Sequence, residues 1–356
     1  MVRSAGEAGF GEGGVREAFA NQVDYCRNNG ATVTARIVAA IAAQLDDPSP
    51  GVFIERIRDW PGHALSDAVA LRSAGGLRGL FLAGRAPELT PIYGGEEADD
   101  ALVVAGVVHR HERELLGWLG SPPQTNEAGR SSGFVAAMLW LAGQGLPPKF
   151  ECLEIGSSAG INLMIDRYRY DLGGVPVGPA GAAMQFAPEW RGPPPPDRTI
   201  EFAALRGCDV APLDLTDPAQ ALRLRAYIWP EQPVRFERLD AAIAEAKRLP
   251  PDLAALNAAD FVERELARPQ AAGTTRVLMH SIVWQYVPAD QQARVTAAME
   301  QAGRNATPDR TLAWISLEAD RTLLGHVLGV RFWPGGELER RIATAQAHGA
   351  WLAWEG

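Results

Sequence analysis

The segment from Glu154 to Asn162 has residue types and a spacing that suit more than one chemistry. It reads Glu-Ile-Gly-Ser-Ser-Ala-Gly-Ile-Asn and continues a short apolar run at 150–155. Gly156 and Gly160 allow a tight backbone turn that approaches a ligand closely, and the acid before them can hold a cationic or hydroxylated group. The same residues fit Gly-x-Ser-x-Gly, with Ser158 as a nucleophile. A turn that only packs a helix on a strand is the third interpretation.

The first interpretation rests on a resemblance. Glu154, Gly156 and Gly160 resemble the E/D-x-G-x-G-x-G loop of class I S-adenosylmethionine-dependent methyltransferases, with Ser158 in place of the middle glycine. The resemblance implies S-adenosylmethionine as cofactor, with Asn162 also at its site. The dinucleotide fingerprint G-x-G-x-x-G does not match, which disfavours NAD.

Two further acids follow the next strands of the expected sheet. In the methyltransferase fold an acid after the second strand holds the ribose hydroxyls, and Asp209 follows the candidate strand 199–205, with Asp214 as the alternative. A polar group after the third strand lies at the adenine, and Asp260 occupies that place. Turn formation by Asp209 and helix capping by Asp260 are the competing interpretations.

The candidate fourth strand, 275–283, is followed by residues suited to catalysis. In this fold the carboxyl end of that strand faces the reacting methyl group. His280 is a candidate base or acceptor-orienting group, and Tyr286 is a second catalytic candidate. A histidine with purely structural partners is the alternative.

A polar cluster precedes the apolar helix expected over 134–141. Gln124, Asn126 and Arg130 are candidate substrate-binding residues, and Glu127 is a candidate catalytic residue. The Arg130 guanidinium could bind a carboxylate of a ligand, and the Glu127 carboxylate could bind an amine. Helix capping explains one or two of these side chains but not all four. We expect the cluster to lie on a helical domain and to face the Gly156 turn.

The hydrolase interpretation requires an acid and then a histidine after Ser158. Asp260 followed by His280, His326 or His348 would supply them. An α/β-hydrolase also needs several strands before its nucleophile, whereas the region upstream of Ser158 is helical in pattern.

The elements that must position these residues change in character at 145–148. Residues 1–14 are glycine-rich and predict a disordered tail, and 15–145 carry apolar residues at helical spacing between glycine and proline breakers. From 146 to 356 strand and helix patterns alternate, interrupted by a Pro/Gly-rich insertion at about 173–198. Strands are expected at 150–155, 199–205, 254–258, 275–283 and 310–317, and helices at 161–170, 235–248 and 289–302.

The final stretch, 325–354, alternates apolar and polar residues around Pro334, which is typical of antiparallel strands. The sequence therefore predicts an α/β fold. It has a Rossmann-like, methyltransferase-type and mostly parallel sheet with an antiparallel C-terminal edge, preceded by an all-helical N-terminal domain.

Composition limits the partners. The formal net charge is −9, which disfavours nonspecific binding to nucleic acid. No apolar run approaches the length of a membrane span. The three cysteines form no metal-binding pattern and fit a reducing cytosol. We expect a cytoplasmic protein that binds a small molecule and uses no metal, nucleic acid or membrane, and whose oligomeric state the sequence leaves open.

Four segments taken together resemble an uncharacterised bacterial family, a domain of unknown function of about this length. They are Gln124–Glu127 with Arg130, Glu154–Asn162, Tyr227–Gln232, and His280–Ser281 with Gln285–Tyr286. The family implies no activity. The sequence accordingly predicts methyl transfer to a small molecule, with a serine hydrolase or a non-catalytic binding protein as alternatives.

Overall fold

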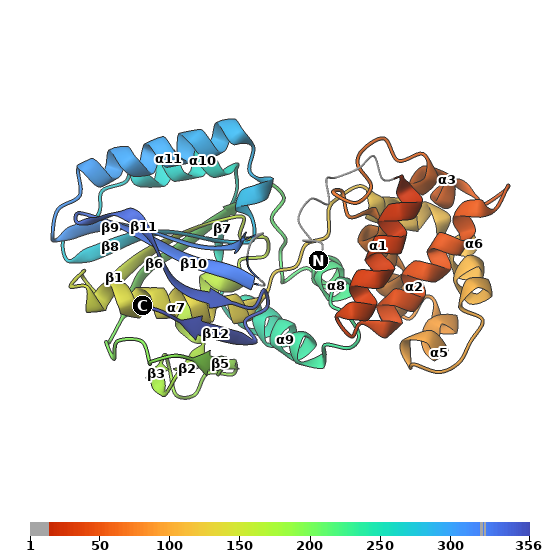
Figure 1. The fold of residues 1–356 in the computed structure, drawn as a ribbon, viewed down its shortest axis with the longest axis horizontal. Coiled ribbons are helices and arrows are strands. Elements are labelled where there is room, and N and C mark those ends of the chain that lie inside the picture. Colours follow the sequence, from red (N-terminus) through yellow and green to blue (C-terminus); the bar gives the residue numbers. More distant parts are fainter. Residues whose placement is uncertain (1–13, 321–322, 324) are drawn as a thin grey trace, which may run out of the picture. The chain divides into compact units, whose positions relative to one another are not determined.

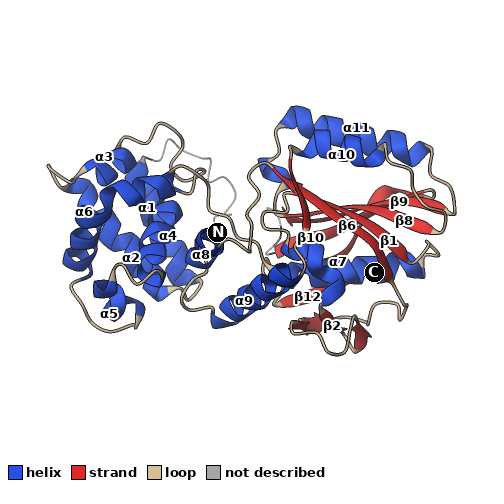
Figure 2. Cartoon of the chain, turned by 180° about the vertical axis from the view of Figure 1, so that it is seen from behind, coloured by secondary structure: helices blue, strands red, loops and turns tan. Residues whose placement is uncertain are grey.

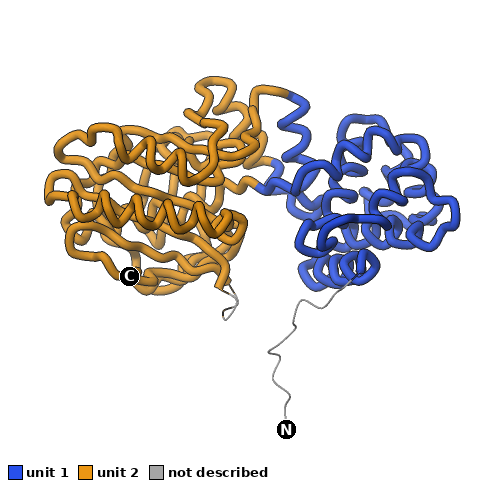
Figure 3. The backbone as a smooth tube through the Cα atoms, turned by 90° about the horizontal axis from the view of Figure 1, so that it is seen from above, with its two compact units in different colours: residues 1–125, 218–236 blue, residues 126–217, 237–356 orange. Residues whose placement is uncertain are grey.

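The computed structural model describes residues 14–320, 323 and 325–356, so the predicted tail lies outside the described residues except for Gly14. The chain forms two compact units, shown in Figure 3. Unit 1 comprises residues 1–125 and 218–236, and unit 2 comprises 126–217 and 237–356. This division differs from the predicted boundary at 145, because the chain enters unit 2 already at residue 126 and later returns to unit 1.

The described residues of unit 1 fold into helices around one apolar core, visible as the helical part of Figure 2. In the first helix Ala18, Phe19, Val23 and Cys26 are buried, which is the three- and four-residue spacing of a single helix face. The helices are α1 (Val15–Asn28), α2 (Thr32–Ala42), α3 (Val52–Arg58), α4 (Val69–Leu82), α5 (Thr90–Tyr93), α6 (Asp100–Leu119) and α8 (Pro218–Ala226), with short 3₁₀ helices η1 (Ala43–Asp46) and η2 (Pro87–Leu89). Helix α9 (Pro233–Arg248) begins in unit 1 and ends in unit 2.

Unit 2 is built on one large sheet with the order β5-β12-β11-β10-β9-β8-β1-β6-β7. Five neighbouring pairs are parallel and the three pairs from β9 to β12 are antiparallel, which confirms a mostly parallel sheet. The strands are β1 (Lys149–Ile155), β5 (Glu189–Arg191), β6 (Glu201–Asp209), β7 (Asp252–Ala255), β8 (Thr274–Ser281), β9 (Arg310–Asp320), β10 (Gly325–Trp333), β11 (Gly336–Ala345) and β12 (Trp351–Trp354).

The strand order reverses at β1. From β1 the chain adds β6 and β7 on one side and then crosses to β8 and β9 on the other. All eight residues of β8 are buried, as expected for a parallel strand covered on both faces. In sheets of this kind ligands bind outside the carboxyl ends of the strands at such a reversal.

Helices cover the two faces of the sheet, as Figure 1 shows. Helices α10 (Ala258–Leu266) and α11 (Ala289–Arg304) pack on one face, and α7 (Ser131–Gly143) packs against β9 and β10. Every residue of α7 from Ser131 to Leu141 is buried, so this helix is apolar on all sides and is part of unit 2 rather than of the helical domain to which the sequence pattern assigned it.

Two predicted elements were wrong. The segment 161–170 forms the 3₁₀ helix η4 (Ile161–Arg167) and then strand β2 (Arg169–Leu172). Residues 161–165 are all buried, so tertiary packing from several sides overrides the helical preference. The insertion at 173–198 is also more than a loop. It contains β3 (Val175–Val177), β4 (Gln185–Phe186) and β5, of which β3 and β4 pair with β2 and β5 joins the main sheet beside β12.

Candidate functional site

The glycine turn after β1 has an alternating left-handed backbone. Its φ angles are +67° at Gly156, +53° at Ser158 and +71° at Gly160. The Ser157 amide donates to the carbonyl of Cys208 on β6 (3.0 Å), and the Gly160 amide donates to the carbonyl of Ser157 (2.8 Å). The turn is therefore a closed loop fixed to the neighbouring strand.

Gly156 is required by a neighbour within the chain. A Cβ atom at this position would lie 2.3 Å from Cγ2 of Val283, in the segment that follows β8. Contacts below about 3 Å are not tolerated, and the positive φ also disfavours other residues. The glycine therefore lets the loop after β8 pack directly on the loop after β1.

Glu154 and Asn162 form a buried polar pair beneath this turn. The Asn162 side-chain amide donates to Oε1 of Glu154 at 2.8 Å, and Glu154 is only 2% exposed. Oε2 of Glu154 and Oδ1 of Asn162 are both buried and have no hydrogen-bond donor among the described residues. Burial raises the pKa of the Glu154 carboxyl to about 7, against the opposing effects of the Asn162 hydrogen bond and the charge of Arg130. The pair thus presents two acceptors that call for a proton or a cationic donor.

Asp209 ends β6 and holds the turn from the other side. Its Oδ2 accepts the Ser158 amide at 2.8 Å, and its Oδ1 accepts the Ala211 amide at 2.9 Å. The alternative acid, Asp214, accepts the amide and hydroxyl of Thr216 and closes a local turn. Of the two, Asp209 is the one in direct contact with the glycine turn.

The polar cluster at 126–130 belongs to unit 2, not to the helical unit as expected. Oδ1 of Asn126 accepts the Ile161 amide at 3.0 Å, so this residue lies at the glycine turn. Nε of Arg130 donates to the carbonyl of Ala347 at 2.9 Å, and Glu127 lies 3.4 Å from the guanidinium of Arg238. Gln124 falls in unit 1.

His280 has both ring nitrogens engaged. Nε1 of Trp314 donates to Nε2 of His280 at 2.9 Å, and Nδ1 of His280 lies 2.6 Å from Oε1 of Glu318. An indole N–H can only donate, so Nε2 is the acceptor and Nδ1 carries the proton. The ring also stacks on Trp284 with centroids 5.1 Å apart. The sequence reasoning missed Trp314 and Glu318, although their spacing of four along a strand places both on one face.

His280 and Glu154 point to opposite faces of the sheet. Glu154 is paired with Met279 across the parallel strands β1 and β8, so the next residue, His280, faces the other way. The two remaining candidates lie farther out. Asp260 is near the start of α10, where it pairs with Arg294 at 2.7 Å and receives a hydrogen bond from Asn257, and Tyr286 is 70% exposed.

An acidic trough opens beside His280 on the face of the sheet that carries α11. One hollow of about 270 Å³ adjoins another of about 650 Å³, and they share Ser316, Glu318 and Glu339. Oε1 of Glu318 also accepts the amides of Val283 and Trp284 at 3.2 Å each, while its Oε2 accepts no hydrogen bond from the described residues. We define the acidic trough by the lining of the first hollow: His280, Trp284, Thr296, Trp314, Ser316, Glu318, Arg331 and Glu339.

The loops after β1 and β8 share a second feature. Among the described residues of unit 2, Ser158 and Ile282 are the two residues other than glycine with a left-handed backbone, at φ +53° and +52°. This conformation is costly for a β-branched side chain such as that of Ile282, and such strain concentrates at functional sites. Because Val283 touches Gly156 and Trp284 lines the trough, the strained loop connects the glycine turn to the acidic trough.

The described residues hold neither a cluster of metal ligands nor a membrane-spanning helix. Within the described ranges, no group of three or more His, Cys, Asp or Glu side chains is arranged to hold a metal ion. No helix of the described chain is both long enough and apolar enough to cross a lipid bilayer.

The family comparison covers nearly the whole chain. Residues 16–354 match DUF2332, described as an uncharacterized protein conserved in bacteria, and the chain belongs to this family. Comparison with curated proteins and with solved structures gave no match.

Proposed function

We propose that this DUF2332 protein is an S-adenosylmethionine-dependent methyltransferase that acts on a small molecule. The observation that carries the proposal is the pair of strained, touching loops after β1 and β8, at the point where the strand order reverses. An acid with an unsatisfied oxygen lies beneath one loop, and a hollow with carboxylates and indoles lies beside the other. A cofactor and an acceptor would then meet outside the carboxyl ends of these two strands.

The residues of the turn suit the two polar ends of the cofactor. Oε2 of Glu154 and Oδ1 of Asn162 are acceptors that match a ligand ammonium, which has three donors. Because both oxygens are buried, the turn must open locally before a ligand can reach them. Asp209 is the residue for ribose hydroxyls, since a carboxylate that accepts two amides keeps further lone pairs. When bound, the sulfonium supplies an already activated methyl group.

The acidic trough suits an amine as the methyl acceptor. Oε2 of Glu318, the Glu339 carboxylate and the ring of Trp284 favour a cationic group beside an aromatic face, whereas the ring of Trp314 already carries the Arg331 guanidinium at 5.9 Å. One of the carboxylates would take the proton that an ammonium must lose before it attacks. His280 acts here as a positioning residue, because its two nitrogens hold Trp314 and Glu318 in place.

Calorimetric titration of the full chain with S-adenosylhomocysteine tests the cofactor site. We expect binding in the micromolar range at pH 8, weakened about tenfold or more by Asp209→Asn and by Glu154→Gln, because each replaces a carboxylate that the bound cofactor would use as an acceptor. Glu201→Gln, at the exposed start of β6, is the matched control and should bind like wild type. Equal affinity in all four proteins, or no heat with wild type, rules out this site.

The hydrolase alternative has one observation in its favour, the left-handed Ser158, which a nucleophile turn would also show. Against it, β1 is the first strand in the described chain, and His280, one of the three candidate histidines, has both ring nitrogens engaged elsewhere. We expect a fluorophosphonate probe to leave the protein unlabelled. Stoichiometric labelling that is lost in Ser158→Ala would favour the hydrolase instead.

We also infer that the protein works in the cytosol. Its three cysteines are all free and buried, which is consistent with a reducing compartment. Its acidic charge disfavours nucleic acid as a partner and leaves a small molecule as the expected ligand.

A further inference from the structure

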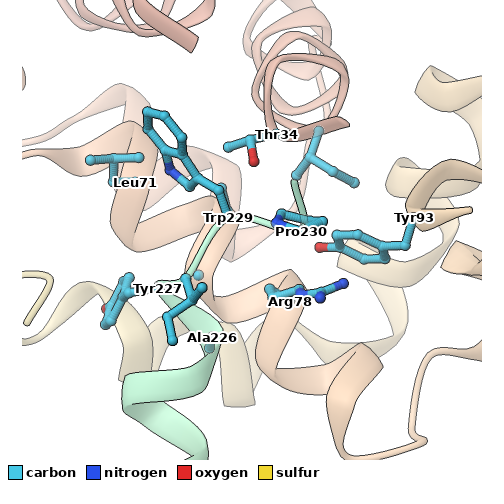
Figure 4. Close-up of a pocket in the computed structure, with 12 residues that line it drawn as sticks. Thr34, Leu71, Arg78, Tyr93, Ala226, Tyr227, Trp229 and Pro230 are labelled. Atoms are coloured by element: carbon cyan, nitrogen blue, oxygen red, sulfur yellow. The ribbon is translucent and has the colours of Figure 1, made fainter. Parts of the chain in front are cut away.

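Unit 1 contains a small pocket that the proposed methyl transfer does not use. It lies between α2, α4 and α5 and the segment that follows α8, as Figure 4 shows. That segment, Tyr227–Gln232, is one of the four by which the chain resembles its family, and residues 227–230 line the pocket. The pocket has a volume of about 30 Å³, which is room for about two or three water molecules.

Arg78 is the unusual residue of this pocket. Its guanidinium lies over the ring of Tyr93 at 4.5 Å and near the rings of Phe81 and Phe236 at 5.4 and 5.5 Å. Within the described chain it forms no ion pair and no hydrogen bond, and its Nε is buried without a partner. A half-buried guanidinium with five donors and no acceptor is costly, and a bound anion would remove that cost.

Two hydroxyls extend the donor set. The side chain of Thr34 is 7% exposed and, like the Tyr93 hydroxyl, makes no hydrogen bond among the described residues. In Figure 4 the Tyr93 hydroxyl points toward Pro230, across the pocket from α5. One guanidinium and two hydroxyls are thus available to a single ligand group.

The other walls are apolar and the local charge is limited. Ile37, Leu71, Ala74, Trp229 and Pro230 surround the donors. The nearby Glu231 carboxylate forms no ion pair with Arg78, although its charge acts on the guanidinium; its Oε1 accepts the Val33 amide at 2.6 Å and its Oε2 is buried without a donor. A single cation beside a carboxylate favours a singly charged ligand over a phosphate, and a planar carboxylate matches the guanidinium fork.

We propose that this pocket of unit 1 binds a small organic monocarboxylate, whose charged end meets Arg78, Thr34 and Tyr93 and whose apolar end lies against Trp229 and Ile37. The pocket is independent of the glycine turn, so either proposal can fail without the other. A ligand here would also tie the segment after α8 to helices α2 and α4.

Calorimetry of the full chain with butyrate, butyramide and inorganic phosphate as probes tests the proposal. We expect saturable binding of butyrate, with butyramide and phosphate at least about tenfold weaker, because only butyrate has one planar anionic group and an apolar tail. Binding of butyramide equal to that of butyrate, tighter binding of phosphate, or no heat with butyrate overturns it.

Variants locate the site. Arg78→Met keeps the apolar stem and removes the donors, and it should weaken butyrate binding about 10- to 100-fold. Thr34→Val keeps the shape and should weaken it about 3- to 10-fold, which gives a second test if the first variant does not fold. Arg85→Met, just after α4 and paired with Glu114 outside the pocket, is the control and should bind like wild type. Undiminished binding by folded Arg78→Met or by Thr34→Val rules out this site.

Discussion

Replacing Glu154 with glutamine should stabilise unit 2 at high pH. The folded Glu154 carboxyl keeps its proton until about pH 7, whereas an unfolded chain releases it near the ordinary value of 4.5. Between these values the folded state binds more protons, so the wild-type free energy of unfolding falls as the pH rises from about 4.5 to about 7. The glutamine side chain has no such proton to lose, so its contribution to the free energy of unfolding does not change over this pH range.

The size of the effect follows from the two pKa values. A difference between 4.5 and about 7 corresponds to roughly 3 kcal/mol at full deprotonation. We expect Glu154→Gln to exceed wild type by about 3 kcal/mol at pH 8 and by less than about 1 kcal/mol at pH 5. The urea concentration at which backbone amides of β1 lose protection from hydrogen exchange gives the unfolding midpoint. Because β1 belongs to unit 2, this midpoint reports on unit 2 alone.

Glu201→Gln provides the control for this series and should show no growing advantage with pH. The reasoning is refuted if the gap between Glu154→Gln and wild type is the same at pH 5 and pH 8. It is equally refuted if wild type becomes the more stable protein as the pH rises.

Three further outcomes are expected. Gly156→Ala should destabilise unit 2 by about 1–3 kcal/mol in urea unfolding, because its Cβ would meet Val283 and its φ is positive. Gly106→Ala, at an exposed position within α6, should instead stabilise unit 1 by about 0.5–1 kcal/mol. Equal effects of the two substitutions would contradict this expectation. The three buried thiols should not react with Ellman's reagent at pH 8 until urea is added. Burial raises the pKa of Cys208 to about 12 and also raises the pKa values of Cys26 and Cys152. Rapid labelling of the native protein would contradict this. Glu318→Ala should lower the free energy of unfolding of unit 2 by about 3 kcal/mol, because His280 and two backbone amides lose their hydrogen-bond acceptor. An unchanged unfolding midpoint would show that these hydrogen bonds do not stabilise unit 2.

The central strands β1 and β8 could be predicted because their patterns are local. The apolar run before Gly156 and the continuous apolar stretch of β8 carry the signal of buried parallel strands, and the structure has them within one or two residues of the predicted bounds. Helix α11 is similar, with a polar outer face and an acid in its first turn.

The assignment of segments to units could not be predicted in the same way. Helix α7 has no polar face, so its periodicity cannot indicate which core it enters, and it packs on the sheet. The return of 218–236 to unit 1 depends on contacts with residues far away in sequence, such as the Val33 amide with Glu231. No local pattern reports such a contact.

Only part of the candidate site could be predicted from the sequence, because the rest of it also depends on contacts between residues far apart in the chain. The glycines mark positive φ angles, and Asp209 and Asn126 do contact the turn. The environment of His280 depends on Trp314 and Glu318 from another strand, and strand pairing rather than spacing brings them together. Val283, which explains why residue 156 must be glycine, is more than a hundred residues away in the chain.

A structure of the full chain with S-adenosylhomocysteine bound tests the central claim most directly. We expect the ligand to lie over the turn from Gly156 to Gly160, with its ribose hydroxyls at Asp209 and its ammonium within hydrogen-bonding distance of Glu154. A ligand ordered elsewhere on the protein, or an empty turn at a saturating concentration, would contradict the assignment of this turn as a cofactor site.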